Sequence, residues 1–299
     1  MTDAISKRGG FRIPKKAIPY VLLAPIFIYY AIFWLLPVLT SVKEVFTDFD
    51  GHFTLFGNFK LMGESEYFKE SVINTALFAF VSVVLEYIVA LVLAVVLNIS
   101  FPGNKIMMFI SMIPMAITPT ATAILWKTGL MSDGWINTIL VNLHLVDKSF
   151  VYMNAEGLQA VGMLILIDAW TVTPSVMVIL IAGLQGLQKD QKEAAYLFGA
   201  TKMQIFRDVT IPALRPSITT SIITRMIAAI QVWSISVMVL GYGKAPFLVE
   251  RVAFYVEEVP GLSTSSKLAY TYSFFTTVVV LIATVFYLRM TAKNSRSQA

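Results

Sequence analysis

The chain has 299 residues, of which 57% are hydrophobic and 14% charged, with a mean hydropathy of +0.73 and a formal net charge of +5. This composition excludes a soluble globular domain and indicates an integral membrane protein. The chain contains no cysteine and no basic patch interleaved with aromatic residues, which excludes disulfides, thiolate metal sites and a nucleic-acid surface.

Six apolar runs are long enough to cross a hydrocarbon core about 30 Å thick, which requires roughly 20 helical residues. Backbone amides in lipid have to pair within their own segment, and the alternating segments of a β-barrel are absent. The sequence therefore predicts an all-α integral membrane protein with six transmembrane helices, a five-helix core preceded by one N-terminal helix. The predicted spans are 19–40, 72–97, 106–126, 158–183, 217–240 and 268–288.

The segments outside the spans differ in charge. Basic residues gather in 1–18, in the loop 184–216 and in the tail 289–299, so these segments and both termini are expected in the cytoplasm. Residues 41–71 carry mixed charge and turn residues and are expected to form an external loop. The span 19–40 is longer than a signal-peptide core and lacks a small-residue cleavage site. We therefore expect a multi-pass protein of the cell (inner) membrane whose first helix is retained.

Prolines interrupt two of the spans, with Pro114 and Pro119 in the third and Pro174 in the fourth. A proline removes a backbone donor and bends a helix, but neighbouring helices can satisfy the freed carbonyls. Two interpretations stay open, adaptation of the helices to their packing or broken helices that line a solute path. In the connection that follows the third span, the stretch 134–144 is expected to lie flat at the outer surface, anchored by Trp135.

The polar loop 184–216 is predicted to contain two short capped helices. Asp190 and Glu193 have the spacing of a capping box, and Gly199 suits the left-handed position that ends a helix. Thr201 and Gln204 form a second capping box.

The second helix is expected to run to about Asp208, because Pro212 prevents it from continuing far and Pro216 marks the entry to the next span. By itself, this arrangement fits either an ordinary cytoplasmic loop or a docking site for a partner protein.

Short motifs follow one another in a fixed order over residues 74–288. They are Asn74-Thr75, Gly134-Trp135-Ile136-Asn137, Leu184-Gln185-Gly186-Leu187, Glu193-Ala194-Ala195, Gly199-Ala200-Thr201, Ile211-Pro212-Ala213-Leu214, Arg225, Trp233 and Gly241-Tyr242-Gly243-Lys244-Ala245-Pro246. In this order and spacing, the chain resembles the permease subunits of binding-protein-dependent ABC importers, in the branch that includes maltose and glycerol-phosphate systems.

The resemblance implies a subunit without catalytic residues, cofactor or metal of its own, since ATP and Mg would be bound by the partners. No phosphate-binding G-x-x-x-x-G-K-[ST] motif is present. The implied partners are a second permease subunit (forming a heterodimer), two ATP-binding-cassette subunits, an external solute-binding protein and the lipid bilayer, with no nucleic acid. The coupling loop would dock into one ATPase subunit through Glu193, Ala194, Ala195, Phe198, Gly199 and Ala200, and ATP-driven closure would rotate the membrane helices.

The chain departs from the family pattern at three places. Phe198-Gly199-Ala200 replaces the usual Asp-Gly-Ala, and Leu187-Gln188 replaces an Ile-Pro before the loop helix. Trp233-Ser234 replaces a common Phe-Asp pair. The first two departures indicate a particular ATPase partner, and the third falls where solute contacts are expected.

Three charged residues, Glu86, Asp168 and Arg225, fall near the middle of spans. A charge there costs about 2.5–3.5 kcal/mol on insertion scales, so each is expected to be functional or paired. Two interpretations stay open, an internal salt bridge of Arg225 with Asp168 or Glu86, or contact with the solute. Aromatic faces beside hydrogen-bonding groups suit sugars, and they also suit ordinary packing. The predicted solute path is Asp168, Trp170, Gln231, Trp233 and Ser236.

Two other functions are considered. A proton-coupled secondary transporter would use Glu86 and Asp168 as proton carriers, and orthovanadate would separate it from an ATP-driven importer. A membrane enzyme would need a nucleophile, base or metal cluster, and the two histidines, His52 and His144, are far apart in the sequence. The solute stays open among a saccharide, a polyol, a glycerol phosphodiester and a sulfonated sugar.

Overall fold

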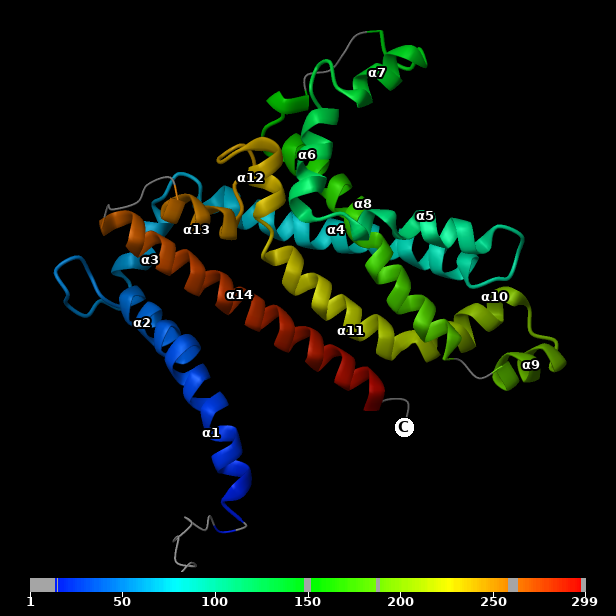
Figure 1. Cartoon of the computed structure of the whole chain (residues 1–299), viewed down its shortest axis with the longest axis horizontal. Helices are drawn as coiled ribbons and strands as arrows, with labels where there is room; N and C mark the ends of the chain where they lie inside the picture. Colours follow the sequence, from blue (N-terminus) through cyan, green and yellow to red (C-terminus); the bar gives the residue numbers. More distant parts are fainter. Residues whose placement is uncertain (1–13, 15, 148–151, 187–188, 258–262, 297–299) are drawn as a thin grey trace, which may run out of the picture.

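The computed structural model of the chain describes residues 14, 16–147, 152–186, 189–257 and 263–296. Within these residues the chain is helical apart from connecting turns and one isolated β-bridge, between Thr47 and Phe53. In Figure 1, α9 and α10 lie at one end of the bundle together with the turn that joins α4 to α5, whereas α3, α12 and α13 lie at the opposite end. The ends of the predicted tails, 1–13 and 297–299, fall outside the described residues.

Four described helices are long and apolar enough to cross a membrane, and two bent helix pairs raise the number to six. The predicted all-α membrane fold is confirmed. The four are the first helix, Ile18–Val45, and three helices of the core, α4 (Phe68–Leu97), α8 (Gly157–Gln185) and α14 (Ser263–Arg296), of which Thr264–Arg289 is the apolar part.

The span predicted over 106–126 is broken into two helices. α5 (Asn104–Ala116) and α6 (Pro119–Gly129) meet at an angle of 95°. Ile117 and Thr118 are extended between them, and the Thr118 hydroxyl accepts a hydrogen bond from the Ala121 amide at 3.4 Å. A proline disfavours helical backbone in the residue before it and suits the first turn of a helix. Pro119 therefore starts a new helix rather than bending one.

The expectation that the second loop helix ends near Asp208 is wrong. α10 (Lys202–Ile205) passes through a wide π turn, η3 (Phe206–Thr210), into α11 (Ile211–Ile230) without interruption. Pro212 has no N–H to donate to the carbonyl four residues earlier, and the wider turn just before it accommodates that loss. Pro216 consequently lies inside α11 rather than at its entry.

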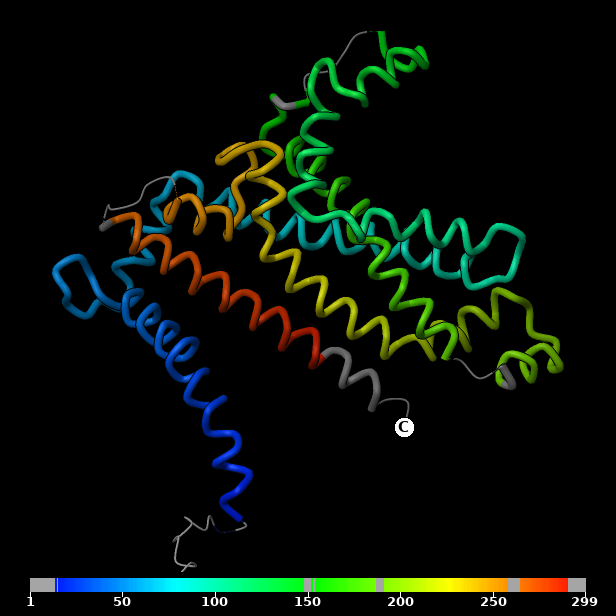
Figure 2. The backbone as a smooth tube through the Cα atoms, viewed as in Figure 1, coloured from blue at the N-terminus to red at the C-terminus, as the bar shows by residue number. Residues whose placement is uncertain are grey.

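A π turn before a proline also occurs in the first helix. Here η1 (Ala31–Leu35) precedes Pro37 and joins α1 (Ile18–Tyr30) to α2 (Leu36–Val45). α1 has no buried residue, and Figure 2 shows it running away from the other helices. α2 is held to the bundle at its end, where Lys267 of α14 donates to Glu44 at 2.6 Å.

The remaining elements are short and lie between the spans. They are α3 (Gly57–Gly63), α7 (Trp135–Asn142), η2 (Tyr152–Asn154), α9 (Lys189–Leu197), α12 (Ser234–Leu240) and α13 (Leu248–Glu257). The segment 41–71, expected as a loop, thus contains α3 and the ends of α2 and α4. Buried Asn58 fixes α3 against α2, because its amide donates to the carbonyls of Val45 at 2.8 Å and Thr47 at 3.0 Å.

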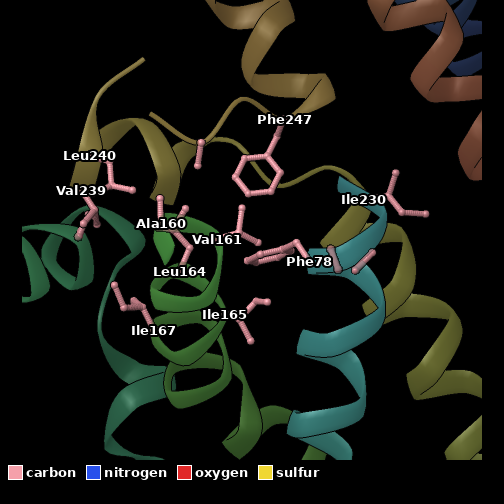
Figure 3. Close-up of a cluster of buried hydrophobic side chains, with 14 of the residues drawn as sticks. Phe78, Ala160, Val161, Leu164, Ile165, Ile167, Ile230, Val239, Leu240 and Phe247 are labelled. Carbon is pink, nitrogen blue, oxygen red and sulfur yellow. The ribbon is translucent and has the colours of Figure 1, made fainter. Parts of the chain in front are cut away.

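A cluster of buried apolar side chains fills the space between α4, α8, α12 and the segment before α13 (Figure 3). Phe78 and Phe247 meet edge to face with ring centroids 5.4 Å apart, and Leu164 of α8 is fully buried in the same cluster. A second cluster joins α4, α8 and α11 through Ala90, Met177 and Leu214. Close packing of this kind makes the core helices move as units.

At Gly183, α8 packs closely against α11. A Cβ atom there would lie 2.7 Å from Ser217 Oγ and 2.8 Å from a methyl carbon of Leu214, whereas one at Gly162 of the same helix would meet nothing within 4 Å. Gly183→Ala is therefore expected to destabilise the protein by about 1–3 kcal/mol through overpacking. Gly162→Ala is expected to change stability by less than about 1 kcal/mol. Equal midpoints of thermal unfolding for the two variants would contradict this packing.

Candidate functional site

The loop helix α9 ends at the glycine that the sequence singles out. Gly199 has a φ of +79°, the predicted left-handed conformation, which is confirmed. The Gly199 amide donates to the Tyr196 carbonyl at 3.0 Å, and the Ala200 amide donates to the Ala195 carbonyl at 3.0 Å. These two bonds form a Schellman motif, which ends α9 sharply and fixes the direction in which the chain leaves.

The second helix begins with the predicted capping box, which is confirmed. The Thr201 amide donates to Gln204 Oε1 at 2.7 Å, and the Gln204 amide donates to the Thr201 hydroxyl at 3.3 Å. The other predicted capping box begins at Asp190, and the Asp190 side chain lies outside the described part of the chain. Leu187 and Gln188 also lie outside it. The turn between α9 and α10 is thus a defined joint.

Large apolar side chains gather on the exposed side of this joint. Leu197 and Phe198 are 88% and 91% exposed, and Tyr196 and Met203 beside them are also exposed. Glu193 and Ala194 are exposed as well, and Ala195 is partly buried. Large apolar side chains are rarely exposed together on a protein surface that contacts only water. This surface is therefore typical of an interaction site. Sequence reasoning missed Leu197 and Met203, although the apolar Phe198 in place of an aspartate pointed to this surface.

The three intramembrane charges lie together in one cluster that joins α4, α8 and α11. Arg225 donates to both oxygens of Glu86, from Nε to Oε2 at 2.7 Å and from Nη2 to Oε1 at 2.8 Å. The same Nη2 donates to Asp168 Oδ2 at 3.0 Å. The Glu86 side chain is fully buried, and Ser82, which sequence reasoning missed, lies between the two carboxylates. Arg225 thus pairs with both of the candidate partners.

The predicted solute-path residues have different surroundings in the structure. Asp168 belongs to the charge cluster. Trp170 and Trp126 meet in a T-shaped arrangement, with ring centroids 5.6 Å apart. Gln231 and Trp233 lie in the break between α11 and α12, which meet at 47°. Ser236 is buried, and its hydroxyl donates to the Ala245 carbonyl at 3.3 Å, so it holds the following turn.

A cavity of about 610 Å³ lies beside Trp126, between α6, α7 and the start of α8. Its lining combines aromatic rings with amides. The lining residues are Trp126, Leu130, Ile136, Tyr152, Asn154, Ala155, Gln159, Met163, Leu166 and Ile167. Trp126, which lines the cavity, contacts both Trp135 and Trp170, so the three rings form one aromatic row.

The turn 241–246 is held by the Asn74-Thr75 motif in the second turn of α4. The Asn74 side chain donates to the Pro246 carbonyl at 3.1 Å, and the Thr75 hydroxyl accepts from the Leu248 amide at 3.1 Å. Lys244 pairs with Glu156, and its ammonium lowers the pKa of the Glu156 carboxyl. Two sequence motifs far apart in the chain therefore build one rigid turn at the end of the bundle opposite α9.

Comparisons with known proteins agree with this architecture. The trehalose/maltose transport system permease protein MalF of Thermococcus litoralis is 29% identical over 279 residues, covering 91% of this chain and 92% of that protein. The sulfoquinovosyl glycerol transport system permease protein SmoG of Agrobacterium fabrum is 26% identical over 235 residues, covering 76% and 75%. The probable ABC transporter permease protein YesP of Bacillus subtilis is 31% identical over 235 residues, covering 76% and 74%.

The fold also matches a solved structure, a bacterial alginate ABC transporter in complex with alginate pentasaccharide-bound periplasmic protein. The TM-score is 0.81 at 20% identity, over 93% of this chain and 96% of that chain. Residues 86–296 match the model of one protein family, which is described as "Binding-protein-dependent transport system inner membrane component". The chain belongs to this family of inner-membrane transport components.

Proposed function

We propose that this protein is the membrane-spanning subunit of an ATP-driven importer for a sugar or sugar-like solute that an external solute-binding protein delivers. The observation that carries the proposal is the joint between α9 and α10. It presents Leu197 and Phe198 almost fully to solvent, and it continues without a break into α11 of the core. A force applied to this joint would therefore act directly on a helix of the bundle.

This arrangement supports a proposal for the partners. Two ATP-binding-cassette subunits would grip the joints of two permease subunits, one of them this chain and the other a different permease. ATP is inside the cell, so the joint and both termini are assigned to the cytoplasm, in agreement with the basic residues of 184–216. The rigid turn 241–246 then faces the side from which the binding protein approaches.

The geometry supports a rigid-body mechanism. Closure of the ATPase dimer would move α10 and α11 together, since η3 joins them as one helix. The charge cluster would carry this motion to α4 and α8, because Arg225 of α11 bonds to both. The break at Gln231–Trp233 would allow α12 to keep its contacts with the turn 241–246 while α11 tilts.

Sugar specificity is supported by the relatives, whose names include trehalose/maltose and sulfoquinovosyl glycerol. Trp170, Gln231 and Trp233 combine apolar faces with hydrogen-bonding groups and stay our candidates for solute contact. Asp168 and Ser236 are occupied by bonds within the chain. We therefore propose that these two residues support the structure around the solute path and do not contact the solute.

Orthovanadate, an inhibitor of ATPases, is expected to stop uptake by the assembled importer in sealed vesicles that are supplied with ATP and binding protein. The physical reason is that the chain itself supplies no energy-coupling chemistry, so transport depends on the partner ATPases. Collapse of the proton gradient by an uncoupler should leave uptake unchanged. Uptake that resists vanadate but falls with the uncoupler would instead support the proton-coupled alternative.

Trp233→Ala and Gln231→Ala are each expected to lower solute uptake about tenfold, corresponding to about 1.4 kcal/mol for one stacking or hydrogen-bonding contact. Trp34→Ala is the matched control, because Trp34 lies on η1 and is 60% exposed on the first helix. The measurement is the uptake rate at saturating binding protein. If both variants transport at the rate of the Trp34 control, these two residues do not contact the solute.

A further inference from the structure

The cavity of about 610 Å³ between α6, α7 and the start of α8 is here called the Trp126 cavity, and none of the predicted solute-path residues lines it. Pockets that hold small-molecule ligands typically measure about 300–1,000 Å³. On α8 the lining runs from Gln159 to Ile167, about 12 Å along the helix. Asp168 follows Ile167, so the cavity extends from the start of α8 to the level of the charge cluster.

Two amide side chains in the lining are not used by the fold. Asn154 and Gln159 are exposed, and neither makes a hydrogen bond within the described part of the chain. An amide group offers both donors and an acceptor. A sugar hydroxyl needs both kinds of partner when it leaves water, so these two side chains suit a ligand that carries hydroxyl groups.

Trp126 supplies an aromatic wall beside the amides. Its ring contacts those of Trp135 and Trp170, with centroids 6.0 and 5.6 Å apart, and these contacts hold it in place. Trp135 Nε1 donates to the Leu125 carbonyl at 3.3 Å, whereas Trp126 Nε1 is buried and has no partner among the described residues. Trp126 therefore offers the cavity ring carbons, which suit the C–H-rich face of a sugar ring.

The lining contains no Asp, Glu, Lys, Arg or His. Lys127 follows Trp126 in the sequence but does not line the cavity, and Glu156, beside the lining residue Ala155, pairs with Lys244. An anionic ligand would leave water at a cost that no cation in this lining offsets. The cavity therefore suits an uncharged ligand.

A second cavity, of about 440 Å³ between α4, α11 and α14, provides a contrast. Thr75 is the one polar residue among its described lining residues, and the Thr75 hydroxyl already accepts from the Leu248 amide at 3.1 Å. A sugar in this second cavity would lose its hydrogen bonds to water without replacement. Of the two cavities, the Trp126 cavity is the one that fits a saccharide.

The Trp126 cavity also adjoins both ends of the proposed solute route. The Gly157 amide donates to the Lys244 carbonyl at 3.3 Å, which joins the start of α8 to the turn 241–246. This turn faces the binding protein in the proposed function. Trp126 meets Trp170, one of the candidates for solute contact, so the cavity lies between the turn and these candidates.

We propose that the Trp126 cavity is a binding subsite for an uncharged saccharide, between the external binding protein and the break at Gln231–Trp233. The saccharide stacks on Trp126 and exchanges hydrogen bonds with Asn154 and Gln159. The subsite rests on the proposed function and narrows its solute class, because a glycerol phosphodiester and a sulfonated sugar are anions.

Thiol protection in the assembled importer, with its partner subunits present, tests the subsite. The chain has no cysteine, so Met163→Cys introduces a thiol that is unique in this chain and lines the cavity. Glucose, maltose and trehalose are the probes. At least one of them, at a concentration twice its dissociation constant, is expected to slow the reaction with N-ethylmaleimide about threefold. Glucose 6-phosphate, which adds a charged group to glucose, should give no protection.

Met131→Cys is the matched control, since Met131 is 41% exposed and does not line the cavity, and its thiol should react at the same rate with and without sugar. Ile136→Cys, in the lining on α7, provides the same readout if Met163→Cys does not assemble. The absence of protection by all three sugars, or equal protection by glucose 6-phosphate, would overturn the proposal. A lining thiol that stays unreactive while Met131→Cys reacts would show that a lipid or the partner permease fills the cavity, which also overturns it.

Uptake gives the second readout. Gln159→Leu keeps a side chain of similar size without the amide, and it is expected to lower uptake about fivefold, the effect of one hydrogen bond. Asn142→Leu is its control, because Asn142 is an exposed amide on α7 outside the lining. Full uptake in Gln159→Leu would overturn the subsite. If that uptake remained sensitive to vanadate, the importer assignment would stand, whereas resistance to vanadate would overturn the importer assignment itself.

Discussion

Loss of Arg225 is expected to be the most damaging single change in the membrane core. Arg225→Met removes the cation that both Glu86 and Asp168 share, and it leaves the buried Glu86 carboxylate without an opposite charge. Breaking a buried ion pair by removal of one member typically costs about 3–5 kcal/mol. The midpoint of thermal unfolding and the yield of assembled importer should both fall sharply.

The controls for Arg225 separate charge from packing. Arg225→Lys keeps the charge but cannot bond to two carboxylates with one planar group, so an intermediate loss is expected. The double variant Arg225→Met with Glu86→Gln removes the unpaired charge and should recover part of the stability. An Arg225→Met protein as stable as the wild type would show that the cluster does not hold α4, α8 and α11 together.

Glu193→Lys is expected to abolish the stimulation of ATP hydrolysis by loaded binding protein while the protein still inserts and assembles. In the proposed docking site Glu193 lies within the interface to the ATPase, and a wrong charge at such a contact typically costs about 2–5 kcal/mol. The lower figure already corresponds to a loss of about 30-fold in coupling. The measurement is ATPase activity of the purified complex with and without loaded binding protein.

Two variants sharpen that experiment. Gln191→Lys places the same charge on α9 two residues away, on another face of the helix, and should retain stimulated turnover. Gly199→Asp combines a charge with a φ of +79° that side chains rarely adopt, so it should uncouple as strongly as Glu193→Lys. Normal stimulation in both Glu193→Lys and Gly199→Asp would refute the docking assignment.

Much of the fold follows from local patterns in the sequence. The length of the apolar runs predicts α4, α8 and α14, and the Thr201 capping box and Gly199 predict the joint between α9 and α10. Prolines are ambiguous signals in the sequence, because the same residue can end a helix, begin one or follow a wide turn. Pro119 begins α6 at 95° to α5, and Pro212 continues a helix that was expected to stop. The difference depends on tertiary contacts that no short window of sequence contains.

The charge cluster illustrates the same limit. The cost of burying a charge identified Glu86, Asp168 and Arg225 one by one, and pairing was one of two interpretations. The structure adds that Arg225 bonds to both acids and that Ser82 lies between them. Ser82 is one helical turn before Glu86, which is a weak signal in a sequence with many serines. Its importance follows only from the packing of α8 against α4.

In the proposed mechanism, a nucleotide-hydrolysing partner inside the cell holds the joint between α9 and α10. The chain has no cysteine, so Leu197→Cys would introduce a unique thiol at a position that is 88% exposed. A short bifunctional thiol reagent should then link this chain to the ATPase subunit, and a membrane-impermeant thiol label added outside intact cells should not react. Labelling from outside, or the absence of any adduct with the ATPase, would contradict the account.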